Sequence, residues 1–341
     1  MAERRDRSDG GGASAGGLTD KPWWPAAKKG LTIAFFVVVL GLVANHARTI
    51  DWPAVWQSMR RTPLLALLTA AALAAVSYAL YSAYDLLGRH ETGHRVPVAQ
   101  VVGVSFVCYA FNVNLGALVG GVALRYRLYG RLGLKVDVVT RILALSWVTN
   151  WLGYLWLAGG VFTLAPLALP PDWKIGSDGL RWVGVLLLIV AVAYVVACFV
   201  ARGRQWIVRG HAVRLPGGRV ALMQLVVSTL NWSVIAATVW TLLQRQVDYP
   251  AVLSVLLLAA VAGVIAHVPA GLGVLEGVFV ALLAHRIPKT ELIAALLAYR
   301  AIYYLVPLAL ASAVYLTLEA KAANDAPQRK GGSGRKRKAA A

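Results

Sequence analysis

The sequence contains little charge and almost no cysteine. Only 14 % of its 341 residues are charged, and both cysteines, Cys108 and Cys198, lie within apolar stretches. Two cysteines are too few for a disulfide framework or a metal cluster. Soluble domains carry about 25 % charged residues, so the composition excludes an ordinary soluble domain as well as a disordered chain.

Motifs of the common catalytic sites are also absent. The chain has no Gly-rich phosphate loop with its lysine, no Gly-x-Ser-x-Gly, no Cys-x-x-Cys and no His-Glu-x-x-His. The longest ordered segment expected outside the apolar runs, residues 201–219, is too short to fold as a catalytic domain. We therefore expect no enzymatic activity, no metal site and no cofactor.

Apolar residues, in contrast, make up 59 % of the chain and gather in long runs. Because a helix rises about 1.5 Å per residue, about 20 apolar residues cross the bilayer core. The first run follows Lys28 and Lys29 in the charge order of a signal peptide, but no small-residue cleavage site follows it, so we expect a retained span. Six full spans are predicted, at 31–46, 63–87, 138–166, 180–200, 220–244 and 292–318.

Two further apolar runs, 97–124 and 251–285, are interrupted near their midpoints. The interruptions read Asn112-Val113-Asn114-Leu115-Gly116 and His267-Val268-Pro269-Ala270-Gly271-Leu272-Gly273. Glycine and proline free backbone groups that lipid cannot satisfy, so such breaks persist at membrane depth only inside protein or beside a water-filled cavity. Each run therefore either crosses the membrane with a break or turns back as a re-entrant hairpin.

The distribution of basic residues distinguishes these topologies. The chain has 34 Lys and Arg against 15 Asp and Glu, which gives a formal charge of +19. With two hairpins and a cytoplasmic N-terminus, 24 of these cations lie inside and 7 outside; with two crossings, the numbers are 17 and 14. The positive-inside rule favours the hairpins. The excess charge then mainly records orientation, with both termini cytoplasmic and disordered tails at 1–29 and 321–341.

This topology gives two units of opposite orientation. The unit 63–166 holds a hairpin entering from the cytoplasm, the unit 219–318 holds one entering from outside, and the span 180–200 links them. Inverted units with broken helices are typical of transporters. The predicted fold class is an all-α polytopic membrane protein with about six full spans plus two re-entrant broken-helix hairpins arranged as inverted repeats.

In the first hairpin, a half-helix is expected to begin at Gly116 within the membrane. Its unpaired N–H groups and positive dipole end suit an anion such as phosphate. Arg125, Arg127 and Arg131 follow, and we expect them to form a basic rim at the cytoplasmic mouth. Arginine can pair two phosphate oxygens at once, although such a cluster can also serve only to set topology.

In the second hairpin, Glu276 lies five residues past Gly271 and three past Gly273, which commits a carboxylate to membrane depth. A buried carboxylate is costly unless protonated or paired, so it is a candidate functional group. Its expected partners are Arg300 in the following span and His267 across the turn. Glu276 and His267 then gate passage or carry a proton; alternatively, Glu276 and Arg300 only fasten two helices and His267 is a packed residue.

Other polar residues near the breaks have less specific interpretations. Asn112 and Asn114 act either as ligands or as partners of the broken backbone. Asp85, at the end of its span, is expected to be solvated. Packing and interface roles are expected for Tyr299, Tyr303 and Tyr304.

Two motifs carry a family resemblance. They are Asn112-Val113-Asn114-Leu115-Gly116 with Gly120-Gly121 and Arg125-Tyr126-Arg127-Leu128-Tyr129, and Pro269-Ala270-Gly271-Leu272-Gly273-Val274-Leu275-Glu276. With them, residues 30–320 resemble the flippase-like family typified by the transmembrane region of bacterial lysylphosphatidylglycerol synthases, including its stand-alone inner-membrane members. Arg125 matches the arginine that follows the family's first motif, and Glu276 matches the glutamate that closes the second.

The resemblance implies two inverted, re-entrant repeats that move phospholipid or a polyprenyl-linked lipid between leaflets. The chain departs from many relatives at Leu115 and Gly121, where they carry proline and an acid. Relatives that synthesise aminoacylated lipid also have a soluble transferase domain, which the sequence does not contain, so synthase activity is not carried over.

The expected function is therefore a flippase of the bacterial inner membrane. Its substrate would be an anionic phospholipid such as phosphatidylglycerol, cardiolipin or an aminoacylated derivative, or a polyprenyl-linked lipid. One alternative is a non-transporting scaffold whose basic tails recruit lipid or a lipid-synthesis enzyme. Another is an enzyme that acts on a polyprenyl lipid through Glu276. Nucleic acid is not expected as a partner. The candidate substrate-binding residues are Asn112, Asn114, Gly116, Arg125, Arg127, Arg131, Gly271, Gly273, Glu276 and Arg300.

Overall fold

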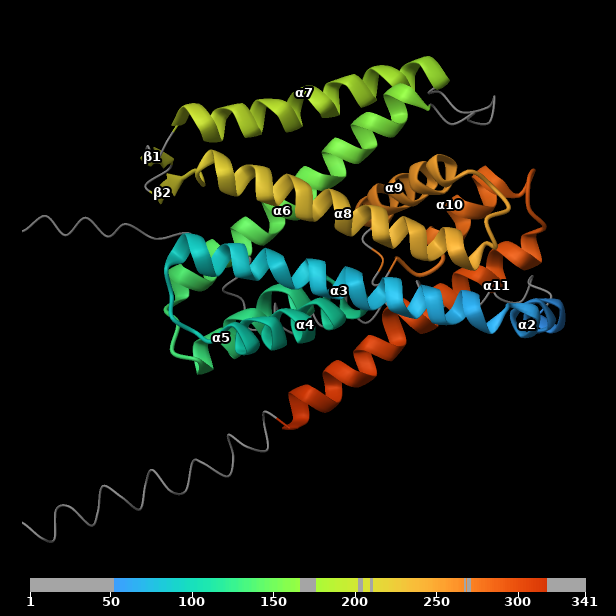
Figure 1. Cartoon of the computed structure of the whole chain (residues 1–341), viewed down its shortest axis with the longest axis horizontal. Helices are drawn as coiled ribbons and strands as arrows, with labels where there is room; N and C mark the ends of the chain where they lie inside the picture. The colour runs from blue at the N-terminus through green and yellow to red at the C-terminus, as the bar shows by residue number, and fades with distance from the viewer. Residues whose placement is uncertain are drawn as a thin grey trace, which may run out of the picture. The chain divides into compact units, whose positions relative to one another are not determined.

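The structure is a computed structural model that describes residues 52–165, 176–201, 205–208, 211–266, 268 and 271–317. These residues form a bundle of helices with one short β-hairpin (Figure 1). The predicted span 31–46, His267 and both predicted tails lie outside the described residues.

Long helices occupy the predicted full spans that the structure describes. They are α3 (Leu64–Thr92), α6 (Val136–Leu164), α7 (Ser177–Ala201), α8 (Gly218–Leu242) and α11 (Lys289–Tyr299), which continues through the π-helix η4 (Arg300–Leu305) to residue 317. The all-α membrane-protein class is thereby confirmed, and six helices of the described part are long and apolar enough to cross a membrane.

The surface of α7 shows why this bundle needs a bilayer. Trp182, Leu186 and Ile189 are 74 %, 59 % and 58 % exposed. Contiguous apolar side chains of this kind are unfavourable in water and favourable against lipid. An unpredicted antiparallel hairpin, β1 (Gln205–Val208) and β2 (His211–Arg214), joins α7 to α8.

The first interrupted run turns back on itself. Helix α4 (Val98–Leu115) ends at Gly116, whose φ of 88° lies in the region that favours glycine. The chain returns along α4 as the π-helix η2 (Ala117–Ala123) and α5 (Leu124–Arg131). A Cβ atom at Gly120 would overlap the backbone of Phe111 and Asn112, so the two arms touch through their main chains.

The second interrupted run has the same plan. Helix α9 (Tyr249–Ala266) is followed by a break with positive φ at Gly271 and Gly273, after which α10 (Val274–Leu283) packs back against α9. The first arms α4 and α9 each have 18 residues, or about 27 Å of helix.

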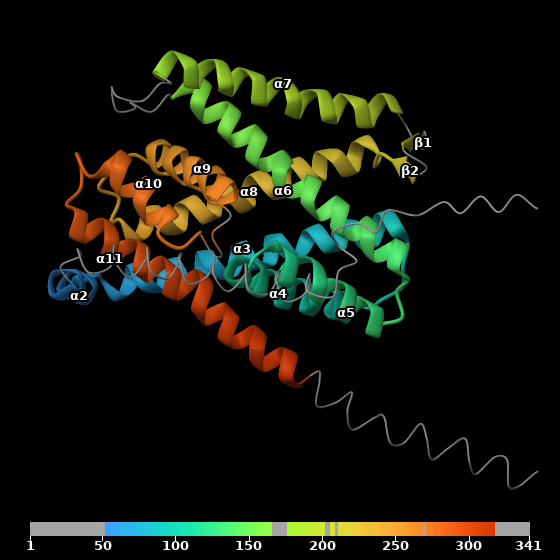
Figure 2. The same ribbon diagram turned by 180° about the vertical axis from the view of Figure 1, so that it is seen from behind.

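The core lies between the long helices. Helix α3 packs along α8, and α6 contacts both of them, while η4 contacts α3 and α4. Figure 2 shows the α11 helix and its continuation crossing α3 on the side that also holds α4. A short helix, α2 (Trp52–Arg61), packs against α11. This packing places both chain breaks next to η4.

Candidate functional site

A cavity of about 570 Å³ lies where the two chain breaks meet. Gly116, Ala117 and Asn112 line it from the first break, and Gly271 and Leu275 line it from the second. Its volume is within the range of sites for small molecules, about 300–1,000 Å³. The structure thus brings together segments that are more than a hundred residues apart in the chain.

The mouth of this cavity is apolar and exposed. Leu118, next to the first break, is 80 % exposed, and Val264, next to the second, is 56 % exposed. Both side chains belong to a bundle whose long helices are apolar enough to cross a membrane.

Aromatic side chains form much of the inner wall. Trp232 and Tyr109 line it, together with Tyr299, Tyr303 and Tyr304 of the α11 segment. Tyr299 stacks on Tyr303 with ring centroids 5.2 Å apart, and both are nearly fully buried. Tyr299, Tyr303 and Tyr304 therefore pack as the sequence predicts, and all three also border the cavity.

The Glu276–Arg300 pair adjoins the cavity through Gly271. Arg300 Nε and Nη2 donate to the two Glu276 carboxylate oxygens, and Nη2 also donates to the Gly271 carbonyl at 3.0 Å. Glu276 Oε2 accepts from the Gly273 N–H at 3.0 Å, which caps the start of α10. The Glu276 and Arg300 side chains are 15 % and 12 % exposed. This ion pair therefore connects the second chain break to η4 and is only partly buried.

Polar side chains satisfy the irregular backbone of η4. Asn114 Nδ2 donates to the Tyr304 carbonyl at 3.2 Å and to its own helix at Ala110. The Tyr78 hydroxyl donates to the Tyr303 carbonyl at 3.1 Å. π-helices are rare and occur often at functional sites, and both η2 and η4 contribute lining residues here. Asn114 therefore partners carbonyls of η4 and of its own helix α4, whereas Asn112 lines the cavity.

A chain of hydroxyl groups leads from the cavity into the core. The Tyr303 hydroxyl lies 2.8 Å from that of Tyr109 and 2.7 Å from Ser77 Oγ, which donates to Asn231 Oδ1 at 2.7 Å. Each hydroxyl has one proton, so the donors run in sequence from Tyr109 through Tyr303 and Ser77 to Asn231. This network fixes the tyrosine wall relative to α3 and α8.

Arg125 departs from its predicted place in a basic rim at the cytoplasmic mouth of the hairpin. It is fully buried, and its Nη2 and Nε donate to the two Asp85 oxygens at 2.9 and 3.2 Å. The Tyr129 hydroxyl also donates to Asp85 at 2.9 Å, and Arg125 contacts Ser146 Oγ at 3.4 Å. The prediction of a solvated Asp85 is likewise wrong, because Asp85 has no exposed surface.

Helical periodicity explains this difference. Arg125, Leu128 and Tyr129 occupy one face of α5 and are buried against the bundle, whereas Arg127 and Arg131 occupy the opposite face and are exposed. The Arg127 guanidinium lies over the Tyr315 ring at 5.7 Å. Of the three predicted rim arginines, only these two are at the surface.

The predicted site residues thus fall into separate groups. Asn112, Gly116 and Gly271 line the cavity, and Glu276, Arg300 and Gly273 adjoin it. Arg125 reaches it only indirectly, through the Tyr81 ring, which stacks on Tyr109 with centroids 3.6 Å apart. The sequence analysis missed Asp85 as the partner of Arg125. Asp85 is the only charged residue in its predicted span, and a lone charge in an apolar span usually has a buried partner.

The described residues define a polytopic helical membrane protein with two interrupted helices around one cavity. The chain belongs to the family of the lysylphosphatidylglycerol synthase TM region, whose model matches residues 30–311. It is similar to the inner membrane protein YbhN of Escherichia coli, with 47 % identity over 302 residues, 88 % of this chain and 95 % of the relative. It is also 31 % identical to the uncharacterized protein slr0712 of Synechocystis over 288 residues, 81 % and 87 % of the two chains.

Proposed function

We propose that this protein moves lipid between the leaflets of a bacterial inner membrane. One observation carries the proposal: both broken helices end at a single cavity whose mouth is lined by exposed apolar side chains. The name of the Escherichia coli relative supports the choice of membrane. The substrate would be an anionic phospholipid such as phosphatidylglycerol or cardiolipin, or a polyprenyl-linked lipid.

The cavity suits the two chemical parts of a lipid. A headgroup must leave water to cross the hydrocarbon core, which is costly for each unpaired polar group. The tyrosine hydroxyls and the partly exposed Glu276–Arg300 pair offer partners there. Acyl chains would remain in the bilayer beyond Leu118 and Val264. Arg125 and Asp85, sealed from the cavity, would hold the first hairpin rather than touch lipid.

The helix arrangement supports an inverted-repeat transporter. In each unit a long helix (α3 or α8) precedes an 18-residue arm, a glycine break and a returning arm, and another long helix follows. The first helices of the two units pack along each other, and the last helix of each unit contacts the first helix of the other. A two-fold relation between the units would produce this exchange of contacts.

Filling the cavity is expected to slow lipid movement about tenfold, equivalent to about 1.4 kcal/mol in the barrier. Gly263 lines the cavity, and a Cβ atom there has open space around it, so Gly263→Phe should place its ring inside without disturbing the fold. The measurement is the rate at which headgroup-labelled phosphatidylglycerol in proteoliposomes becomes accessible to an external quencher.

Gly103→Phe is the matched control. Gly103 also has open space around its Cβ position and does not line the cavity. Unchanged exchange in folded Gly263→Phe would refute the assigned route. Removal of residues 325–341 should leave the rate unchanged, whereas the scaffold hypothesis requires these basic residues for function.

Single cysteines at exposed positions 130 and 286 are expected to react from opposite faces of the membrane. Gly130 follows the returning arm of the first hairpin, and Arg286 follows that of the second. The buried Cys108 and Cys198 are replaced in this background. A membrane-impermeant thiol reagent, applied to sealed vesicles of each orientation, measures the labelling. Reaction of both cysteines from one face would exclude the inverted arrangement.

A further inference from the structure

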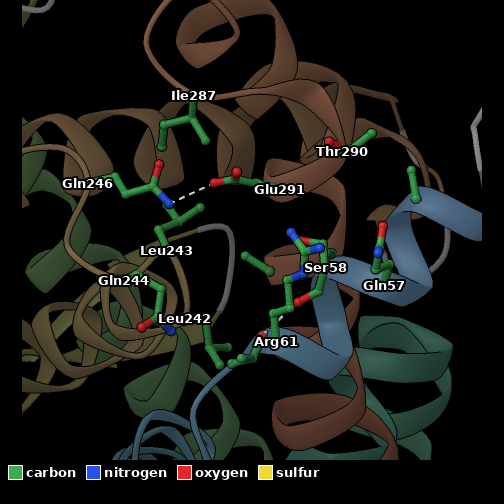
Figure 3. Close-up of a pocket in the computed structure, with 14 residues that line it drawn as sticks. Gln57, Ser58, Arg61, Leu242, Leu243, Gln244, Gln246, Ile287, Thr290 and Glu291 are labelled. Atoms are coloured by element: carbon green, nitrogen blue, oxygen red, sulfur yellow. Dashed lines mark hydrogen bonds between the residues drawn. The ribbon is translucent and has the colours of Figure 1, made fainter.

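A second cavity, of about 320 Å³, lies at the end of the bundle that holds α2. It shares no lining residue with the cavity at the chain breaks. Its walls come from α2, from the turn after α8 and from the start of α11. Figure 3 shows Gln57, Ser58 and Arg61 of α2 across the pocket from Gln244 and Gln246.

The walls of this second cavity combine neutral polar groups with balanced charge. Arg61 and Glu291 contribute one charge of each sign, and Glu291 Oε2 accepts from Gln246 Nε2 at 2.8 Å. The floor includes the buried side chains of Leu243, directly after α8, and Ile287, shortly before α11. The remaining polar lining consists of the amides of Gln57 and Gln244 and the hydroxyls of Ser58, Thr62 and Thr290.

The turn that carries Gln244 is strained. Gln244 and Arg245 have φ values of 53° and 58°, and they are the two non-glycine residues with positive φ in the described chain. The N–H groups of Gln244 and Arg245 bond the carbonyls of Thr241 and Trp240, a helix-ending motif that favours glycine at the position of Gln244. A side chain at a left-handed position costs about 1–2 kcal/mol. Strain of this kind is often retained where the side chain serves a site.

We propose that this second cavity binds a polyhydroxylated group, a glycerol or a sugar. The balanced charge gives no preference for a net ion. Each hydroxyl of such a group both donates and accepts, so adjacent hydroxyls pair a carboxylate, a guanidinium and amides simultaneously. The group can belong to a free polyol or to the headgroup of a lipid in the adjoining leaflet. The inference does not rest on lipid transport.

The test compares two glycine substitutions in neighbouring positions. Gln244→Gly removes a lining amide, whereas Arg245→Gly removes a side chain that lies over Trp240 at 5.0 Å and does not line the cavity. Both relieve left-handed strain, so both should fold.

Binding is measured by native mass spectrometry in a sugar-free detergent. Dioctanoyl phosphatidylglycerol is the probe, and dioctanoyl phosphatidylethanolamine has the same phosphate without the polyol. All variants carry Gly263→Phe, which fills part of the cavity at the chain breaks, so that any binding there is the same in each of them.

Phosphatidylglycerol should bind at least about tenfold more tightly than phosphatidylethanolamine, and Gln244→Gly should lose about that factor, as expected for one or two lost hydrogen bonds. Arg245→Gly should bind as the parent does. Displacement by free glycerol would identify a soluble polyol as the source, and resistance to glycerol would identify the lipid headgroup. Equal affinity for the two lipids, or equal losses in the two glycine variants, would overturn the proposal. Because exchange at the chain breaks is measured separately, failure here leaves lipid transport untouched.

Discussion

Asp85→Ala is expected to lower the free energy of unfolding by about 3–5 kcal/mol, the usual cost of removing one partner of a buried ion pair. Arg125 would keep its charge with 1 % of its side chain exposed, and the Tyr129 hydroxyl would lose its acceptor. Denaturation of the purified protein in detergent, followed by the loss of helical circular dichroism, measures the change.

Two controls isolate the ion pair. Asp178→Ala makes the same chemical change at an exposed position at the start of α7 and should alter stability by less than about 0.5 kcal/mol. Asp85→Leu combined with Arg125→Met removes both charges and should recover most of the loss. If Asp85→Ala alone were as stable as the parent, the buried pair would not be holding α5 to α3.

Glu276→Ala is expected to slow lipid exchange about a hundredfold, or about 2.7 kcal/mol in the barrier. The substitution removes two interactions together: the partner of Arg300 and the acceptor of the Gly273 N–H at the start of α10. Each is worth about 1–3 kcal/mol. The proteoliposome assay measures the rate, and circular dichroism verifies the fold.

Further variants distinguish a structural role of the Glu276–Arg300 pair from a role in lipid passage. Glu276→Gln keeps an oxygen for the Gly273 N–H and should slow exchange only about tenfold, since charge is lost but the cap remains. Glu276→Gln with Arg300→Gln leaves no unpaired charge. If the pair takes part in passage, the double variant stays slow. A folded double variant with the parent rate would show that the pair only joins two helices.

Hydropathy and the positions of glycine were sufficient to predict the long helices of the described residues, although not the short helix α2. Long apolar runs must become helices in lipid because no other open structure pairs all backbone groups. The breaks at Gly116 and Gly271 were also recognisable, since proline, asparagine and glycine interrupt otherwise continuous runs. Local rules could not foresee η2 and η4, because π-helices are rare; in η4 the carbonyls of Tyr303 and Tyr304 are bonded by side chains from α3 and α4.

The site was harder to predict because it depends on which face of a helix meets which neighbour. Arg125 and Arg127 are two residues apart in a basic segment, yet one is buried and the other exposed. Periodicity alone separates these faces but does not tell which one packs inward. The lone carboxylate of Asp85 in an apolar span was the available signal, because a charge at that depth requires a partner.

The contact at Gly120 has a mechanical consequence. Main chain lies on main chain there, and the buried Arg125–Asp85 pair ties the same arm to α3, so the first hairpin should move as a rigid body with α3. The second hairpin has positive-φ glycines on either side of Leu272, and the ion pair that its described residues make with η4 is partly exposed. We therefore expect the hinge of any opening at Gly271 and Gly273, and cysteine crosslinking of α10 to α11 should arrest it.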